Sequence, residues 1–296
     1  IQARRKSSGP PTRPYFDALS ANKFQWCVGS CPTPAWAEKA FPGKKGQEAI
    51  DALWDAIFSV CRITGDGRAV ERWREHVAAT ARRCGTLNER QFKSLRYTNS
   101  LGTDLTVRLP DNHVWAGGSE FTPDGVEFVA NIPTEEIFTA PRRDGVDGRV
   151  YAAMPLAMDG NLVKNFYLDF KDGRIVDVHA EEGGEILRRA IDTDDGAHYL
   201  GEVALVPYDS PIRSKGILFY DTLFDENASC HLAFGHAYPS CVKGGEDLSE
   251  EEQKAAGLNH SMTHVDFMVG TPDLSIVGTT PGGEEIPVFT NGNFAF

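Results

Sequence analysis

The sequence predicts a mixed α+β fold in two parts, and two observations carry the prediction. Apolar residues recur at helical spacing early in the chain, over 47–61 and 68–84. From about residue 97 onward, short runs rich in β-branched and aromatic residues alternate with turn residues, which predicts mostly antiparallel strands. We therefore expect a helix-rich part over 1–96 and an α+β part over 97–296.

The two early segments each carry one apolar face. The first places Leu53 and Trp54 on that face, and the second repeats the pattern with Trp73. We expect both helices to pack on a sheet, with the tryptophans in the core. A third, short helix is expected over 87–95.

Strand signals dominate the remainder. A Lys-Asp-Gly turn at 171–173 predicts a β-hairpin, and an Asn-Gly pair predicts a turn at 291–292. Ser249 precedes an acidic first turn, which predicts the start of a helix that Gly257 ends. The expected strands cover 104–110, 125–133, 161–170, 174–180 and 201–207, and a further helix covers 183–192.

Charge and hydropathy exclude several kinds of partner. The formal net charge of −12 argues against nucleic acid, because phosphate binding needs a basic face. No apolar run approaches the roughly 20 residues that span a bilayer, so no membrane partner is expected. The basic start, 1–14, lacks the apolar stretch of a secretory signal. The six cysteines form no C-x-x-C pair, which favours reduced thiols and a cytoplasmic location.

An unusual polar pair stands in SMTHVDFMVG, at 261–270. His264 and Asp266 lie among apolar residues, two positions apart, so on a strand their side chains share one face. A buried carboxylate is costly unless it is paired or bound to a metal. A lone strand histidine is often a satisfied core residue, so a core pair and a metal site both remain open.

Carboxylates occupy two further apolar contexts. Glu135 and Glu136 are adjacent in NIPTEEIFTAP, where a solvated loop would explain them but the apolar flanks predict that one faces inward. Glu202 heads the apolar strand GEVALVP, which is a poor place for a solvated carboxylate.

The segment at 223–241, LFDENASCHLAFGHAYPSC, concentrates side chains of the kinds that bind metals. It lacks the paired Cys/His spacing of a structural zinc site. Mixed oxygen and nitrogen ligands instead suit a catalytic ion, and several carboxylates suit two ions about 3.5–4 Å apart. The candidates in this segment are Asp225, Glu226, His231, His236 and Tyr238, and His260 is a weaker candidate in the following loop.

At these residues the chain resembles the aminopeptidase T family of metallo-aminopeptidases. The matching pieces include NIPTEEIFTAP, GEVALVPYDSPI, LFYDTLFDENASCHLAFGHAYP, NHSMTHVDFMVGT and the terminal GNFAF. They occur in the family's order, and weaker matches extend back to about Trp36.

The resemblance implies a two-domain, homodimeric enzyme that removes N-terminal residues from peptides with broad specificity. It implies two divalent ions (Zn, Co, Mn or Mg) in a catalytic domain over 97–296, with 1–96 as the end of an N-terminal α/β domain. Family members carry roughly one hundred further residues ahead of this segment, enough to complete that domain. We therefore expect a fragment or a processed chain. The metal positions fall on Glu136, Glu202, His231, His264 and Asp266, while Tyr238 matches a tyrosine at the site and Glu226 a nearby acidic position.

These residues support a mechanistic hypothesis. Glu202 bridges the two ions, with the two other carboxylate ligands at one ion and the two imidazoles at the other. Glu135 is the candidate general base, although on a regular strand it would face away from Glu136, so a bend is required. Tyr238 could donate to the oxyanion.

Two other functions remain open. One is a non-catalytic metal-binding or interaction fragment. The other is a dinuclear hydrolase of another ester or amide, such as a phosphoesterase, although the candidate segments hold few Arg or Lys residues to bind phosphate.

Overall fold

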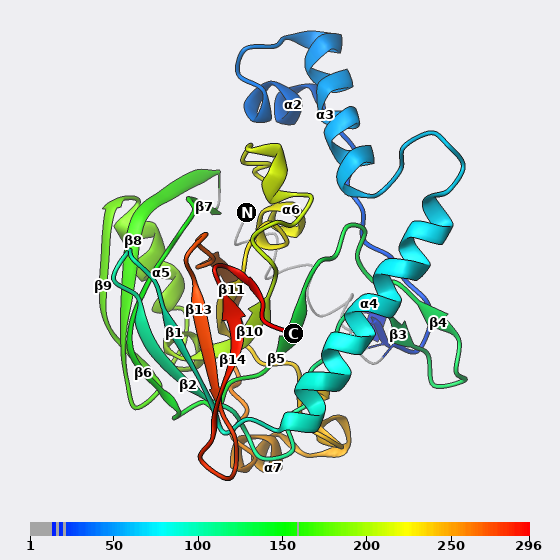
Figure 1. Ribbon diagram of the computed structural model, residues 1–296. Helices are drawn as coiled ribbons and strands as arrows, with labels where there is room; N and C mark the ends of the chain where they lie inside the picture. The colour runs from blue at the N-terminus through cyan, green and yellow to red at the C-terminus, as the bar shows by residue number, and fades with distance from the viewer. Residues whose placement is uncertain (1–13, 16–17, 20–21, 159) are drawn as a thin grey trace.

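A computed structural model describes residues 14–15, 18–19, 22–158 and 160–296 of the chain. The basic start of the sequence, over 1–13, lies outside the described residues, and with it most of the segment tested for a secretory signal. Figure 1 shows two antiparallel sheets with helices around them. The helices are α2 (Pro34–Ala40), α3 (Gly46–Val60), α4 (Ala69–Arg90), α5 (Gly184–Ile191), α6 (Thr222–Glu226) and α7 (Glu250–Ala255).

Within the described residues, a nine-stranded sheet forms the larger layer. Its strand order is β15-β14-β13-β1-β2-β6-β8-β7, and β9 pairs with β8. These strands are β1 (Ser94–Thr98), β2 (Asp104–Arg108), β6 (Val146–Tyr151), β7 (Leu156–Met158), β8 (Asn161–Lys171), β9 (Arg174–Glu182), β13 (Ser275–Thr279), β14 (Glu285–Thr290) and β15 (Asn293–Phe294).

A smaller sheet carries the order β12-β11-β10-β5 and will hold most of the candidate site. Its strands are β5 (Ile137–Thr139), β10 (Leu200–Leu205), β11 (His231–Gly235) and β12 (His264–Met268). A two-stranded ribbon joins β3 (Glu120–Phe121) to β4 (Glu127–Phe128). Every pairing between these named strands is antiparallel, which confirms the predicted α+β class.

The two sheets share one apolar core. The ring of Phe267 on β12 lies 5.9 Å from that of Phe166 on β8, and 6.4 Å from that of Phe234 on β11. All three side chains are fully buried. Because such rings remove large apolar areas from water, this contact holds the small sheet in a fixed position on the large one.

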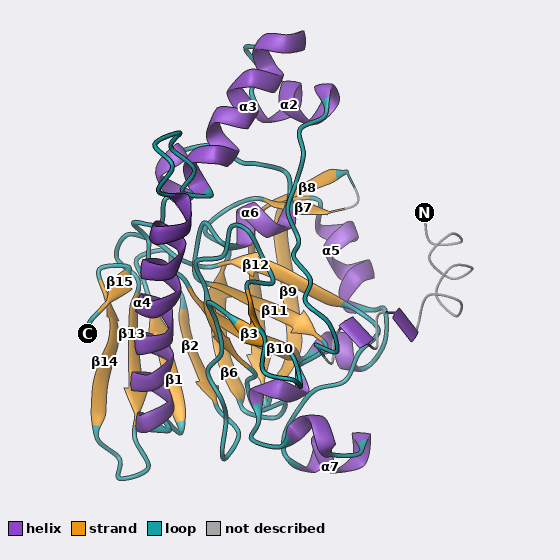
Figure 2. Ribbon diagram, turned by 90° about the vertical axis from the view of Figure 1, so that its right-hand side faces the viewer, coloured by secondary structure: helices purple, strands orange, loops and turns teal. Residues whose placement is uncertain are grey.

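A second apolar cluster joins α2 and α3 to the α6 region. Leu53 and Ile57 of α3 are buried in it with Phe219 and Phe224, whose rings stack 4.8 Å apart. Both views show α2 and α3 extending beyond the two sheets (Figure 1 and Figure 2). The prediction that α3 packs on a sheet is therefore wrong: its apolar face meets other helices. Trp54 is only partly buried, and it stacks on Phe58.

Four other expectations can be compared with the structure. The hairpin after residue 170 is confirmed as β8 and β9, and the helix start predicted at Ser249 is confirmed as α7, where Ser249 and Glu252 form a capping box. The separate helix over 87–95 is wrong, because α4 continues to Arg90 and ends where Gln91 adopts φ 45°. The strand over 125–133 is reduced to β4.

The predicted division at residue 96 falls inside β1, and the two-domain organisation stays a prediction. Among the described residues, the structure contains no helix that is both long enough and apolar enough to cross a bilayer.

Candidate metal centre

The small sheet places four candidate side chains on one face. Glu202 on β10 lies opposite Ala233 on β11, which in turn lies opposite Asp266 on β12. Directly opposed residues of antiparallel strands point to the same side of the sheet. His231 and His264 stand two residues before Ala233 and Asp266, and so share that face. The small side chain of Ala233 leaves room among the four larger ones.

Neighbouring polar atoms of these side chains and of Glu136 lie 3.1–3.7 Å apart. Nε2 of His231 lies 3.1 Å from Oε2 of Glu136 and 3.7 Å from Oε1 of Glu202. Nε2 of His264 lies 3.2 Å from Oε2 of Glu202 and 3.3 Å from Oδ1 of Asp266. The two oxygens of Glu202 therefore face different imidazoles.

The contacts define two groups of three ligands that share Glu202. One group is Glu136, Glu202 and His231, and the other is Glu202, His264 and Asp266. Within each group the ligand atoms all lie within 4.8 Å of one another. This grouping differs from the sequence-based hypothesis, because each imidazole is placed with a carboxylate instead of with the other imidazole.

Backbone carbonyls orient both imidazoles for metal binding. Nδ1 of His231 lies 3.0 Å from the carbonyl oxygen of Ser229, and Nδ1 of His264 lies 2.8 Å from that of His236. A carbonyl only accepts, so each Nδ1 carries the proton and each Nε2 faces the carboxylates. Such carbonyl contacts are typical of metal-bound histidines. The donor set and its orientation thus fit divalent cations.

The buried carboxylates of the cluster need a compensating positive charge. Burial raises the pKa of Glu136 above its ordinary value, and raises that of Glu226 well above it. Burial also acts on Glu202, but the hydrogen bonds from His231 and His264 outweigh it and bring its pKa to about 2. The buried carboxylates in turn raise the pKa of both imidazoles well above the usual range, against the effect of burial. A cation would supply the charge that these protons otherwise provide.

Glu226 and Tyr238 lie at the margin of the cluster. Glu226, at the end of α6, lines with Asp266 a small hollow of about 10 Å³ whose walls include Leu156 and Met268. The Tyr238 ring lies 5.3 Å from the ring of His264 and is partly exposed.

The other candidates lie outside the two ligand groups. Asp225 accepts the backbone N–H of Phe219 at 2.7 Å, so it caps a loop. His236 contributes its carbonyl to His264, while its ring meets that of His260 at 5.6 Å.

Glu135 points to a different partner from Glu136. Its two oxygens lie 2.5 and 2.8 Å from the two terminal nitrogens of Arg62, and its side chain is buried. Although 133–136 form no regular strand, the two adjacent carboxylates still face different partners, as neighbouring side chains on an extended chain do. Sequence reasoning missed Arg62, and no local pattern distinguishes it from the other arginines of the chain.

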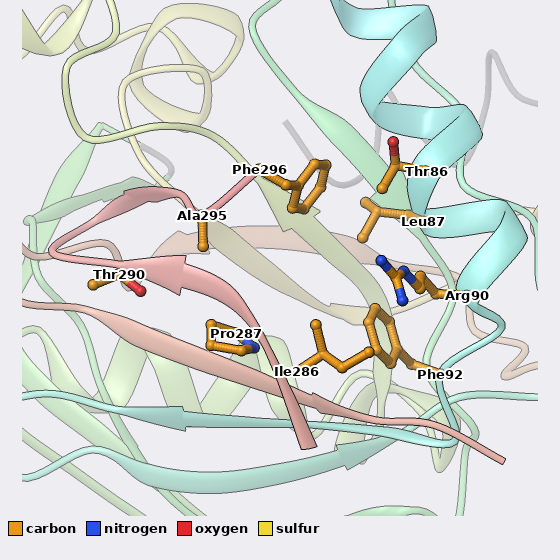
Figure 3. Close-up of a pocket in the computed structure, with 9 residues that line it drawn as sticks. All are labelled: Thr86, Leu87, Arg90, Phe92, Ile286, Pro287, Thr290, Ala295 and Phe296. Carbon is orange, nitrogen blue, oxygen red and sulfur yellow. The ribbon is translucent and has the colours of Figure 1, made fainter. Parts of the chain in front are cut away.

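A larger cavity of about 450 Å³ lies elsewhere, between α4 and β14 (Figure 3). None of its lining residues belongs to the ligand groups. They are Thr86, Leu87, Arg90, Phe92, Ile286, Pro287, Thr290, Ala295 and Phe296.

Comparisons with known proteins identify the family of the chain. Residues 1–294 match the family model described as thermophilic metalloprotease (M29). Aminopeptidase AmpS of Bacillus subtilis is 49% identical over 296 residues, covering 100% of this chain and 72% of that protein. Aminopeptidase 2 of Geobacillus stearothermophilus is 48% identical, covering 100% of this chain and 71% of that protein.

Solved structures extend the comparison. Wild-type AmpT of Thermus thermophilus superposes with a TM-score of 0.88 at 40% identity, covering 96% of this chain and 68% of that one. A 2,5-dihydroxypyridine dioxygenase of Pseudomonas putida shares the fold alone, with a TM-score of 0.53 at 15% identity over 75% of this chain and 62% of that one. The chain is homologous to the aminopeptidases, and it belongs to the thermophilic metalloprotease (M29) family.

Proposed function

We propose that the chain is a metal-dependent aminopeptidase that removes N-terminal residues from peptides with broad specificity, using two divalent ions. The observation that carries the proposal is the buried pair of ligand groups joined by Glu202. Two adjacent cations, when bound, lower the pKa of a water molecule and polarise the carbonyl of the scissile bond.

The residues of the chain take distinct parts in this proposal. Glu136 and His231 would hold one cation, His264 and Asp266 the other, and Glu202 would bridge them. Since Glu202 offers one oxygen to each group, its removal disturbs both.

The small hollow suits a substrate's N-terminal ammonium, because three acidic residues line it next to apolar side chains. The acidic residues are Asp225, Glu226 and Asp266, and the apolar ones include Leu156 and Met268. Tyr238, beside His264, is our candidate donor to the developing oxyanion. Taking up a proton by Glu135 requires its pair with Arg62 to open, because both oxygens of Glu135 are engaged there.

The wider setting is also a proposal. From the family resemblance we propose that the substrates are peptides with a free N-terminus and that the chain assembles as a homodimer and is divided into 1–96 and 97–296. The composition supports a cytoplasmic location. The relatives' names say aminopeptidase, which supports the substrate class.

Substitution of Glu202 by Ala tests the function. We expect hydrolysis of aminoacyl-p-nitroanilides to fall to background and the bound metal, measured by mass spectrometry, to fall with it. Glu182→Ala is the matched control, because Glu182 is an exposed glutamate whose ion pair among the described residues is with Lys164. Turnover near wild type with full metal content in Glu202→Ala would reject the bridging role.

A further inference from the structure

We propose that Arg62 is a positioning residue for the metal centre. By holding Glu135, it fixes the backbone from which Glu136 reaches His231. The inference rests on the proposed function, since it concerns a residue of that same site. It also gives the loop between α3 and α4 a part in the chemistry of the small sheet.

The contact between Arg62 and Glu135 is a buried, two-point ion pair. Nη1 and Nη2 of Arg62 meet Oε1 and Oε2 of Glu135 at 2.5 and 2.8 Å, and their side chains are only 16% and 5% exposed. Two parallel hydrogen bonds to a planar guanidinium fix orientation as well as distance. The pair therefore determines where the Glu135 side chain points.

His76 of α4 extends the contact to the backbone. Its Nδ1 lies 3.0 Å from Nη2 of Arg62, and its Nε2 lies 2.7 Å from the carbonyl oxygen of Thr134. Arginine can only donate and a carbonyl can only accept, so His76 accepts at Nδ1 and donates from Nε2. Arg62 and His76 thus hold residues 134 and 135 together.

Asn227 holds the same segment through its backbone. Its Oδ1 accepts the backbone N–H of Glu135 at 2.7 Å, and its Nδ2 donates to the carbonyl of Leu223 at 3.0 Å. With the side chain of Glu135 fixed by Arg62 and its N–H by Asn227, the next residue has little freedom. Oε2 of Glu136 accordingly lies 3.1 Å from Nε2 of His231.

The backbone of Arg62 supports a role for its side chain. Arg62 has φ +62° at the end of α3. Its N–H donates to Ser59, and the N–H of Ile63 donates to Phe58, which together form a Schellman motif. Glycine is the usual residue at this left-handed position, because other residues adopt it at a cost. Arg62 adopts this costly backbone conformation while its side chain makes two buried hydrogen bonds to a carboxylate. Such a combination is typical of a residue whose position serves a functional site.

The chain offers a second two-point ion pair away from the site, with side chains that are more exposed than those of Arg62 and Glu135, at 40% and 23%. Arg149 on β6 contacts Asp169 on β8 at 2.6 Å through both its Nε and its Nη2. Its guanidinium stacks over the Tyr167 ring at 3.9 Å, as that of Arg62 lies over the Trp73 ring at 5.3 Å. Arg149 touches none of the proposed ligands, so it controls for the loss of any two-point pair.

The test is a Co²⁺ titration of the full chain after chelation. Affinity is measured against a competing chelator, and the ligand field by visible absorption. We expect Arg62→Met to weaken Co²⁺ binding about 10–100-fold and to change the spectrum, as substitutions behind a metal ligand do. Arg62→Lys should recover part of the affinity, while Arg149→Met should match the wild type.

The outcomes separate the two proposals. A folded Arg62→Met protein with wild-type affinity and spectrum overturns the positioning role and leaves the proposed function standing. A wild-type chain that binds no Co²⁺ overturns both. If Arg62→Met does not fold, the double variant Arg62→Met with Glu135→Met leaves no unpaired buried charge. Weak Co²⁺ binding by that folded double variant supports the role, and wild-type binding overturns it.

Discussion

The two sheets use the same antiparallel pairing but treat polar residues differently. In the large sheet, burial alternates along the strands, as β2 and β8 show. In the small sheet, β10 and β11 are buried at every position. A charged residue in the large sheet can face water, whereas Glu202 and His231 cannot. The comparison teaches that charge in a fully buried strand must have a partner, and here the partners are other ligand-type side chains.

Removing the metal should have the largest effect, and this effect should arise at the small sheet. Chelation should abolish peptidase activity and lower the melting temperature, because the buried carboxylates lose their compensating cations. A cation present at one hundred times its dissociation constant stabilises the folded chain by about 2.7 kcal/mol. Scanning fluorimetry before and after restoring Co²⁺ measures the effect. An unchanged melting temperature and full activity in metal-free protein would contradict it.

Enlarging the centre of the small sheet should have the next largest effect. Ala233 lies between Glu202 and Asp266, so Ala233→Leu fills the space among the ligands. We expect loss of metal and about 1–3 kcal/mol lower stability from overpacking. Thr106→Leu is the control, because Thr106 lies between Arg96 and Asp147 on a half-buried position of the large sheet. Urea unfolding and metal analysis compare the two, and equal effects would remove the distinction between the sheets.

Two glycine substitutions should distinguish a loss of stability alone from a loss of stability with weaker metal binding. At Gly117, with φ +151°, a Cβ would lie 2.5 Å from the carbonyl oxygen of Glu136. At Gly148, with φ +113°, it would lie 2.2 Å from that of Asp104 in the large sheet. Both changes to Ala should lower the melting temperature, and only Gly117→Ala should also weaken Co²⁺ binding. Equal Co²⁺ affinities in the two variants would argue that Glu136 is not sensitive to its backbone position.

The smallest effect is expected at an exposed ion pair of the large sheet. Arg96 contacts Asp104 at 3.0 Å, and both side chains are about 60% exposed. Arg96→Ala should leave both the free energy of unfolding and metal binding nearly unchanged, because solvent-exposed ion pairs contribute little to stability. Urea unfolding checks the first point. A large loss of stability would show that ion pairs on the solvated face of the large sheet contribute more to the free energy of unfolding than we expect.

How well a feature could be predicted depends on how far apart in the sequence its interacting residues lie. Alternation along β12 indicated a shared face for His264 and Asp266, and their ligand atoms lie 3.3 Å apart. Local spacing also located the β8–β9 hairpin and the start of α7. The end of α4 was missed because it depends on the left-handed conformation of Gln91, which is neither Gly nor Asn. Arg62 was missed because its partner Glu135 lies 73 positions away.

The register of β12 against β11 has a consequence for folding. The side-chain direction on a strand reverses at every residue, so a slip of one position would turn His264 and Asp266 together to the opposite face. A slipped sheet could still pair its backbone, yet it would present no second ligand group beside Glu202. The proposed cations, when bound, would therefore stabilise only those chains in which Ala233 faces Asp266, and would shift the population toward that register.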